Sequence, residues 1–115
     1  MKASKPFRAI LLVAFSPAAL AETLYTATPL GSLGGGFTSA YSINALGQVT
    51  GESTTPNGQL HAFVYTDGVM TDLGTLPGSS DSHGFGINNA GQVTGSSGGQ
   101  AFVYDRSVMT SSLTA

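Results

Sequence analysis

The chain lacks cysteine and tryptophan altogether, and only 9% of its 115 residues are charged. Without cysteine it forms no disulfides, although small secreted domains often depend on them. A lipid anchor attached to a cysteine at a cleavage site is excluded for the same reason. Stability must therefore come from packing within the chain or between chains.

The N-terminal segment has the three parts of a cleavable signal peptide. Its first eight residues carry three basic side chains, residues 9–15 are a short apolar run, and Ala19-Leu20-Ala21 offers the small residues that signal peptidase recognises. The run is far shorter than the roughly 20 apolar residues of a membrane-spanning helix. We therefore expect residues 1–21 to be a signal peptide. The mature chain, 22–115, should be secreted, periplasmic or on the cell surface, with no membrane anchor.

Removing that segment leaves an acidic, glycine-rich chain. Arg106 is its one basic residue against six acidic ones, which gives a net charge of −5. Nucleic acids and anionic membranes are bound by clustered Lys and Arg, so we expect neither as a partner. All sixteen glycines lie in this part. Ile, Val, Phe, Tyr and Leu recur among them at regular places, which argues against a disordered linker, and glycine has no three-residue period, which excludes collagen.

The mature chain contains two copies of one sequence unit. Residues 43–51, Ile-Asn-Ala-Leu-Gly-Gln-Val-Thr-Gly, return at 87–95 with an offset of 44. The Ala-Phe-Val-Tyr motif at 62–65 returns at 101–104 with an offset of 39. Self-similarity at a fixed period is the signature of a repeat architecture.

The change in offset lies in one loop. This loop is long in the first copy, at 52–60, and short in the second, at 96–99. Insertions confined to a loop are typical of a true structural repeat. We place repeat 1 at about 30–72 and repeat 2 at about 73–113.

Each unit predicts four short strands. Residues 41–43 alternate large and small side chains, and Asn44 to Gly47 then predicts a type I turn into the second strand. The next pair of strands, 61–65 and 69–73, is joined across Asp67-Gly68, a strong hairpin signal. The counterpart of that turn in the second copy lacks the glycine, so the second hairpin is less strongly indicated.

Four short antiparallel strands in about 40 residues are typical of a β-propeller blade. The sequence therefore predicts an all-β fold of two blade-like repeats, with a small twisted β-sandwich as the alternative. Repeat arrays usually need at least about three units for stability. Two-blade chains would then assemble into a ring, or the chain is a fragment of a longer array.

Three motifs carry a resemblance to a known family. His61-Ala62-Phe63-Val64-Tyr65, the segment 68–76 and the segment 87–95 resemble the bacterial extracellular HAF repeat family, named after the His-Ala-Phe present here. The resemblance covers about residues 30–110. It implies an exported bacterial protein with propeller-like repeats and no assigned activity. Gln100 departs from the pattern, because it stands where the first copy has histidine, and family members usually carry more copies.

No catalytic constellation stands out. Ser80, Asp81 and His83 are the residue types of a hydrolytic triad, but a working triad is assembled from distant segments. We interpret these three as a polar loop before a strand. The glycine-rich segments 34–36 and 84–86 could suggest a phosphate-binding loop, yet neither segment is followed by a lysine or a predicted helix. Tight turns and close strand packing explain them better.

Metal sites are also weakly supported. His61 and His83 are the only histidines, and no acidic ligand with zinc-motif spacing accompanies them. Calcium would prefer the carboxylates, but these are scattered one to a loop without the spacing of a calcium-binding loop. The acids concerned are Glu52, Asp67, Asp72 and Asp81. We expect no metal and no cofactor.

The leading interpretation is an exported, non-enzymatic β-repeat module with a structural or ligand-binding role. Its partner would be an unknown ligand or further copies of like repeats. The alternatives are an extracellular hydrolase acting on polysaccharide and a truncated fragment of a longer propeller.

Overall fold

A computed structural model describes residues 26–112 of the chain. The predicted signal peptide, residues 1–21, lies outside this part. Within it, eight strands form two four-stranded antiparallel sheets and there is no α-helix. No helix in residues 26–112 is therefore long and apolar enough to cross a membrane.

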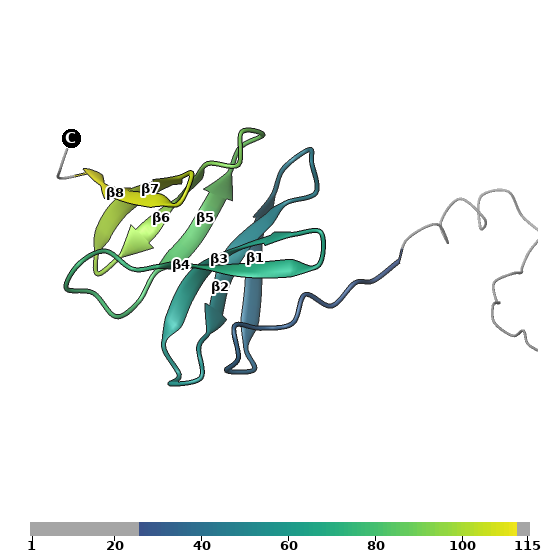
Figure 1. Ribbon diagram of the computed structural model, residues 1–115, viewed down its shortest axis with the longest axis horizontal. Coiled ribbons are helices and arrows are strands. Elements are labelled where there is room, and N and C mark those ends of the chain that lie inside the picture. The colour runs from purple at the N-terminus through teal and green to yellow at the C-terminus, as the bar shows by residue number, and fades with distance from the viewer. Residues whose placement is uncertain (1–25, 113–115) are drawn as a thin grey trace, which may run out of the picture.

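Each sheet is a simple meander in chain order, and the prediction of an all-β fold of two four-stranded antiparallel repeats is confirmed (Figure 1). The strands of the first sheet are β1 (Thr38–Ile43), β2 (Val49–Thr54), β3 (Leu60–Thr66) and β4 (Val69–Gly74). Those of the second sheet are β5 (His83–Ile87), β6 (Val93–Ser97), β7 (Gln100–Asp105) and β8 (Val108–Ser111).

The turn between the first two strands of each sheet forms as predicted. The amide of Gly47 donates to the carbonyl of Asn44 (3.1 Å), and the side-chain Oδ1 of Asn44 accepts from the amides of Leu46 and Gln48. Gly47 has a φ of 81°, in the left-handed region that glycine adopts without strain. The turn at Asn88 repeats these bonds.

The hairpin between β3 and β4 and the corresponding hairpin between β7 and β8 also form. Asp67 and Gly68 have φ angles of 50° and 87°, the left-handed pair of a type I′ turn. Arg106 and Ser107 adopt the same conformation at 48° and 74°. The second hairpin is thus made without the glycine that would relieve its strain.

Several strand boundaries differ from the sequence prediction. In the second sheet, β5 begins at His83, which was expected in a polar loop, and β6 runs on to Ser97, into the predicted loop 96–99. β1 begins at Thr38, three residues before the predicted start. The prediction placed the start too late because a bulge between Ala40 and Ser42 interrupts the alternation of side chains. β2 runs on to Thr54, so Glu52 lies in a strand and not in the predicted loop. A Cβ added to Gly51, opposite the bulge, would overlap the carbonyl oxygen of Ser39, which explains a glycine in mid-strand.

The core lies between the two sheets. β5 packs against β2, β1 and β3, so the first strand of the second sheet lies over the first sheet (Figure 1). Buried side chains from both sheets and from the connecting segment form the core cluster. These residues are Ala62, Leu73, Leu76, Val93 and Phe102.

The two sides of each sheet differ in what they contact. We call the side that bears Thr50 and Val64, which are register partners in β2 and β3, the forward face of the first sheet. Its opposite side, the rear face, bears Val49 and Tyr65. In the second sheet the forward face bears the equivalent residues 94 and 103, and the rear face residues 93 and 104. The core is formed where the forward face of the first sheet meets the rear face of the second.

Candidate functional site: the interface between the repeats

A buried serine joins the two sheets. Ser82, just before β5, accepts a hydrogen bond through its Oγ from the amide of Ala62 in β3 (2.8 Å). The same hydroxyl donates to the carbonyl of Gly74 at the end of β4 (2.6 Å). Ser82 and Ala62 are both fully buried. The hydroxyl therefore satisfies backbone groups that would otherwise be costly to bury.

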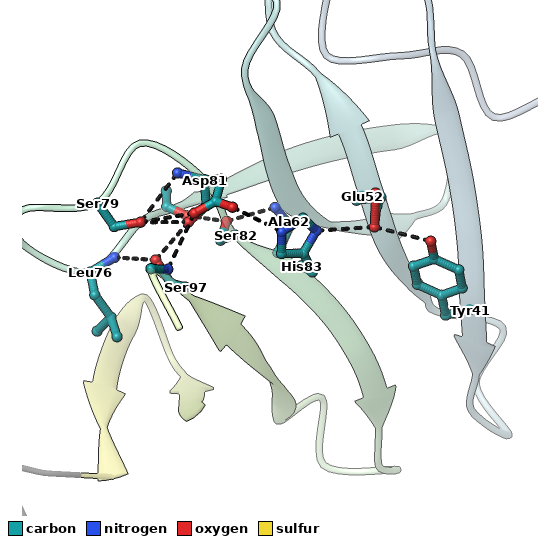
Figure 2. A network of polar contacts seen from close by, with 11 residues as sticks. Tyr41, Glu52, Ala62, Leu76, Ser79, Asp81, Ser82, His83 and Ser97 are labelled. Atoms are coloured by element: carbon teal, nitrogen blue, oxygen red, sulfur yellow. Dashed lines mark hydrogen bonds and ion pairs between the residues drawn. The ribbon is translucent and has the colours of Figure 1, made fainter. Parts of the chain in front are cut away.

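A second polar contact occurs once in each repeat. Ser53 Oγ accepts a hydrogen bond from the amide of Leu33, and Ser97 Oγ accepts one from the amide of Leu76, both at 2.9 Å. Each hydroxyl also donates to a backbone carbonyl just before the first strand of its own repeat. Every repeat thus ties its leading segment to its own second strand. Leu76 and Ser97 are drawn with the interface network in Figure 2.

The ionisable residues of the interface form one chain of contacts (Figure 2). His83 on β5 contacts Glu52 Oε2 on β2 through Nδ1 and Asp81 Oδ2 through Nε2, each at 3.1 Å. Glu52 Oε2 also accepts from the hydroxyl of Tyr41 on β1 (3.0 Å). The network extends from the first strand of one sheet to the loop that leads into the other.

The network changes the ionisation of its members. Burial opposes protonation of His83, but the hydrogen bonds and charges of Glu52 and Asp81 outweigh it and raise the pKa of the imidazole above its ordinary value. The hydrogen bond from His83, with further ones from the Gly98 amide and the Ser79 hydroxyl, lowers the pKa of Asp81. When the imidazole is protonated, it lies between two carboxylates, one on the first sheet and one in the loop that leads into the second.

The equivalent turns of the two repeats are also in contact. The side-chain amide of Asn44 donates to the carbonyl of Asn88 (2.8 Å), and the amide of Ala45 donates to Oδ1 of Asn89 (2.8 Å). The partners in each bond are 44 residues apart. The repeats therefore stack with corresponding elements side by side.

The suspected hydrolytic residues do not assemble into a triad. Ser80 is exposed, and it is the Ser79 hydroxyl that contacts Asp81 Oδ1 (3.1 Å). Both ring nitrogens of His83 face carboxylates, so no serine hydroxyl is paired with the imidazole. Sequence reasoning missed Glu52 as a partner of His83, because the two are 31 residues apart and the second repeat has Ser96 in its place.

The other candidate ligands form one pair and one isolated residue, not a cluster. His61 pairs through Nδ1 with the carboxylate of Asp72 (2.9 Å), and Asp67 occupies an exposed hairpin turn. Between residues 26 and 112, no group of three or more His, Cys, Asp or Glu side chains is arranged to hold a metal ion.

The glycine-rich segments serve close packing. A Cβ on Gly35 would meet the side chain of Thr54 and overlap the carbonyl of Thr55, and a Cβ on Gly84 would overlap Thr50 Oγ1 across the sheet interface. Gly35 and Gly84 are therefore close-approach positions, whereas Gly34 and Gly36 have positive φ angles of 120° and 93°, as in tight turns.

One cleft opens between the repeats. It has a volume of about 300 Å³ and is lined from both sheets, by Gln48 and Val64 on one side and by Tyr104, Asp105 and Arg106 on the other. Asp105 Oδ2 accepts from Gln92 Nε2 (3.2 Å) and lies 3.4 Å from Arg106 Nη2. An amide, a phenol and an ion pair here offer hydrogen bonds to a small polar ligand. The sequence did not indicate this cleft, because it exists only where the two sheets meet.

Comparison with known proteins found no matching family model, no matching curated protein and no matching solved structure. Function is therefore argued from the sequence and from this geometry.

Proposed function

We propose that the protein is an exported, non-enzymatic β-repeat module of the HAF repeat type, whose two sheets act as successive propeller-like blades. The observation that carries the proposal is the Ser82 contact, in which the second repeat satisfies the backbone amide of Ala62 in the first. This contact belongs to an interface that is made of equivalent elements, turn against turn and strand against sheet. Stacked repeats of this kind are typical of propellers and other repeat arrays.

The chemistry of the interface supports a structural role. His83 contacts Glu52 through one ring nitrogen and Asp81 through the other, so both of its polar atoms are used within the interface. A hydrolase would need an acid or base directed at a substrate, within hydrogen-bond reach of the reacting atoms. The cleft beside Asp105 and Arg106 is the place where the module would bind a small polar ligand.

Export is tested by expressing the full chain in a bacterial host and weighing the product by mass spectrometry. We expect the product outside the cytoplasm to have lost residues 1–21. A full-length mass confined to the cytoplasm would contradict export. Cooperative thermal unfolding followed by circular dichroism distinguishes a folded module from a truncated fragment that does not fold.

The non-enzymatic assignment is tested on the same product. We expect no hydrolysis of a panel of polysaccharides. Turnover that is abolished by Glu52→Gln or Asp81→Asn, and retained by the control Asp67→Asn in an exposed turn, would overturn the assignment.

A further inference from the structure

The interface between the repeats uses only two of the four sheet faces. The forward face of the second sheet and the rear face of the first sheet contact no other sheet within residues 26–112, and we call them uncovered in that sense, although Phe63 and Ser53 on the rear face are buried. Each of the two faces carries a hollow. The hollow on the second sheet has a volume of about 390 Å³ and is lined by Thr94, Ala101, Val103, Thr110 and Ser112, among others. The hollow on the first sheet has about 490 Å³ and is lined by Leu30, Ala40, Ile43 and Val49, among others.

The uncovered faces share most of their apolar and threonine side chains with the faces already in contact, although His61 and Asp72 of the first sheet correspond to Gln100 and Ser111 of the second. On the forward side, Thr50, Ala62, Val64 and Thr71 of the first sheet recur unchanged in the second, as Thr94, Ala101, Val103 and Thr110. On the rear side, Ile87, Val93, Tyr104 and Met109 of the second sheet have identical counterparts in the first, namely Ile43, Val49, Tyr65 and Met70. The molecule therefore presents both halves of its own internal interface, one at each end.

Burial shows what the missing contact would cover. Ala62 is 0% exposed beneath β5, whereas its counterpart Ala101 is exposed. Val93 is 0% exposed in the core, whereas its counterpart Val49 is partly exposed. Ile43, at the edge of the uncovered rear face, is 67% exposed. These are apolar side chains that the repeat buries when a neighbour is present.

The first repeat also has the polar group that the contact requires. Thr38 occupies the position of Ser82, and its Oγ1 donates to the carbonyl of Gly31 (2.6 Å), as Ser82 Oγ donates to that of Gly74. The hydroxyl thus donates as Ser82 does, and it also lies 3.0 Å from Ser53 Oγ within its own repeat. In an incoming copy it would accept from the amide of Ala101.

The leucines that lie between the two sheets also have counterparts in the first repeat. Leu73 and Leu76 lie between the sheets, and the second repeat has Ser112 at the position equivalent to Leu73. The leading segment of the first repeat carries the equivalent leucines, Leu30 and Leu33. A neighbouring first repeat would bring this pair to the uncovered forward face.

The charges near the two hollows do not oppose a contact between them. No charged side chain lines either hollow in the part of the chain that the structure describes. The rear face also bears Asp72, outside the hollow, and this carboxylate is paired with His61. In a mature chain of net charge −5, the two hollows can therefore approach without burying an unpaired carboxylate.

We infer that these two faces bind each other between chains: the forward face of one copy receives the rear face of a second copy, head to tail. The inference rests on the proposed function and names its partner as a second copy of this chain. Because the two faces differ, the contact is heterologous and repeats until a ring closes or a filament grows.

The contact between copies is weaker than the internal interface. Ser39 and Ser96 stand where His83 and Glu52 form their pair, so the electrostatic link is absent. Ala40 stands where Gly84 lies against Thr50, so the first strand approaches less closely. Association should therefore depend on concentration.

The test is the mass of the exported product of the full chain, measured by sedimentation velocity over a concentration series. We expect the wild type to associate. Val103→Glu blocks the forward face and Ile43→Glu blocks the rear face, and each should weaken association at least about tenfold, because a carboxylate would be buried without a partner. Val69→Glu is the matched control, since Val69 is 62% exposed on the first sheet and lines neither hollow. It should associate as the wild type does.

Mixing the two blocked variants separates head-to-tail binding from other modes. Val103→Glu keeps an intact rear face and Ile43→Glu an intact forward face, so an equimolar mixture should form a species of two chains and nothing larger. That recovery also shows that both variants are folded. Association blocked by Val103→Glu but not by Ile43→Glu would overturn the inference, because it indicates a contact between two forward faces.

The proposed function and this inference fail in different ways. A cooperatively folded wild type that stays monomeric at every concentration overturns the inference and leaves the exported module standing. A product that does not unfold cooperatively contradicts both.

Discussion

The amide of Ala62 in β3 donates to the side-chain hydroxyl of Ser82, which lies 20 residues later at the start of the second repeat (2.8 Å). Neither residue is exposed. A backbone group in the interior of one sheet is thus satisfied by a side chain of the next. The stability of the first sheet therefore depends on the presence of the second.

Replacing Ser82 by alanine should measure this dependence. Ser82→Ala leaves the buried amide of Ala62 and the carbonyl of Gly74 without this partner, so we expect the free energy of unfolding to fall by about 1–3 kcal/mol. Urea denaturation followed by circular dichroism gives the value. Ser80→Ala, at an exposed position nearby, should change it by less than about 0.5 kcal/mol. Ser82→Thr should retain most of the stability, since Thr38 holds the equivalent place, and a loss as large as that of alanine would contradict this explanation.

The close approach of β5 to the first sheet gives a second prediction. A Cβ on Gly84 would overlap Thr50 Oγ1, and Thr50 is held by its hydrogen bond to the carbonyl of Phe63 (2.7 Å). Gly84→Ala should therefore force the sheets apart and lower the free energy of unfolding by about 1–3 kcal/mol.

The neighbouring glycine supplies the control for that variant. A Cβ on Gly86 would lie 3.2 Å from Thr94 Oγ1, on a residue that is exposed and that a small shift can relieve. Gly86→Ala should cost clearly less than Gly84→Ala in the same denaturation experiment. Equal losses for the two variants would show that strand flexibility, and not the sheet contact, sets the requirement for glycine.

Local patterns in the sequence were sufficient to predict the strands and turns. Asn44 and Gly47 specify their turn through bonds within five residues, and the Asp67-Gly68 hairpin is likewise local. The bulge at Ala40 was not predicted, because it depends on the glycine of a neighbouring strand, Gly51. The alternation of side chains along a strand breaks at a bulge, so the predicted strand was shorter than the observed β1.

The contacts between the two sheets could not be predicted from the sequence, for a different reason. His83 meets Glu52 only because β5 lies over β2, and no periodicity within one strand records that placement. Asp81 and His83, two residues apart, were interpreted as part of a polar loop before a strand. Their contact with Glu52 gives them a role in joining the sheets.

The raised pKa of His83 predicts that stability depends on pH. A basic group whose pKa is higher in the folded state stabilises that state fully below its unfolded value, 6.5, and loses this contribution as the pH rises through the folded pKa. The unfolding midpoint should therefore fall as the pH rises from the unfolded value through the folded pKa, by an amount equivalent to about 1 kcal/mol, since the Asp81 carboxylate in one of the two ion pairs is half exposed.

Two variants assign that pH dependence. His83→Gln removes the titrating group, and Glu52→Gln removes one carboxylate while keeping a hydrogen-bond acceptor for Tyr41. Both should flatten the dependence above pH 6.5. Below it, the lowered pKa of Asp81 has the opposite sign: its contribution is present above the ordinary value of 3.8 and is lost as the pH falls through the folded value. An unchanged slope in His83→Gln would exclude the network as its cause.

The strained turn of the second hairpin gives the last prediction. Ser107 has a φ of 74°, in the region where an L-residue pays roughly 1–2 kcal/mol and glycine does not. The first hairpin has Gly68 at the equivalent position, with a φ of 87°. Ser107→Gly should therefore stabilise the protein by about 1 kcal/mol, less the entropy that glycine loses on folding. Gly68→Ser is the reciprocal change and should destabilise it by a similar amount. Thermal unfolding of the two variants beside the wild type measures both effects, and a shift of the same sign in both would mean that backbone conformation at the turn does not control them.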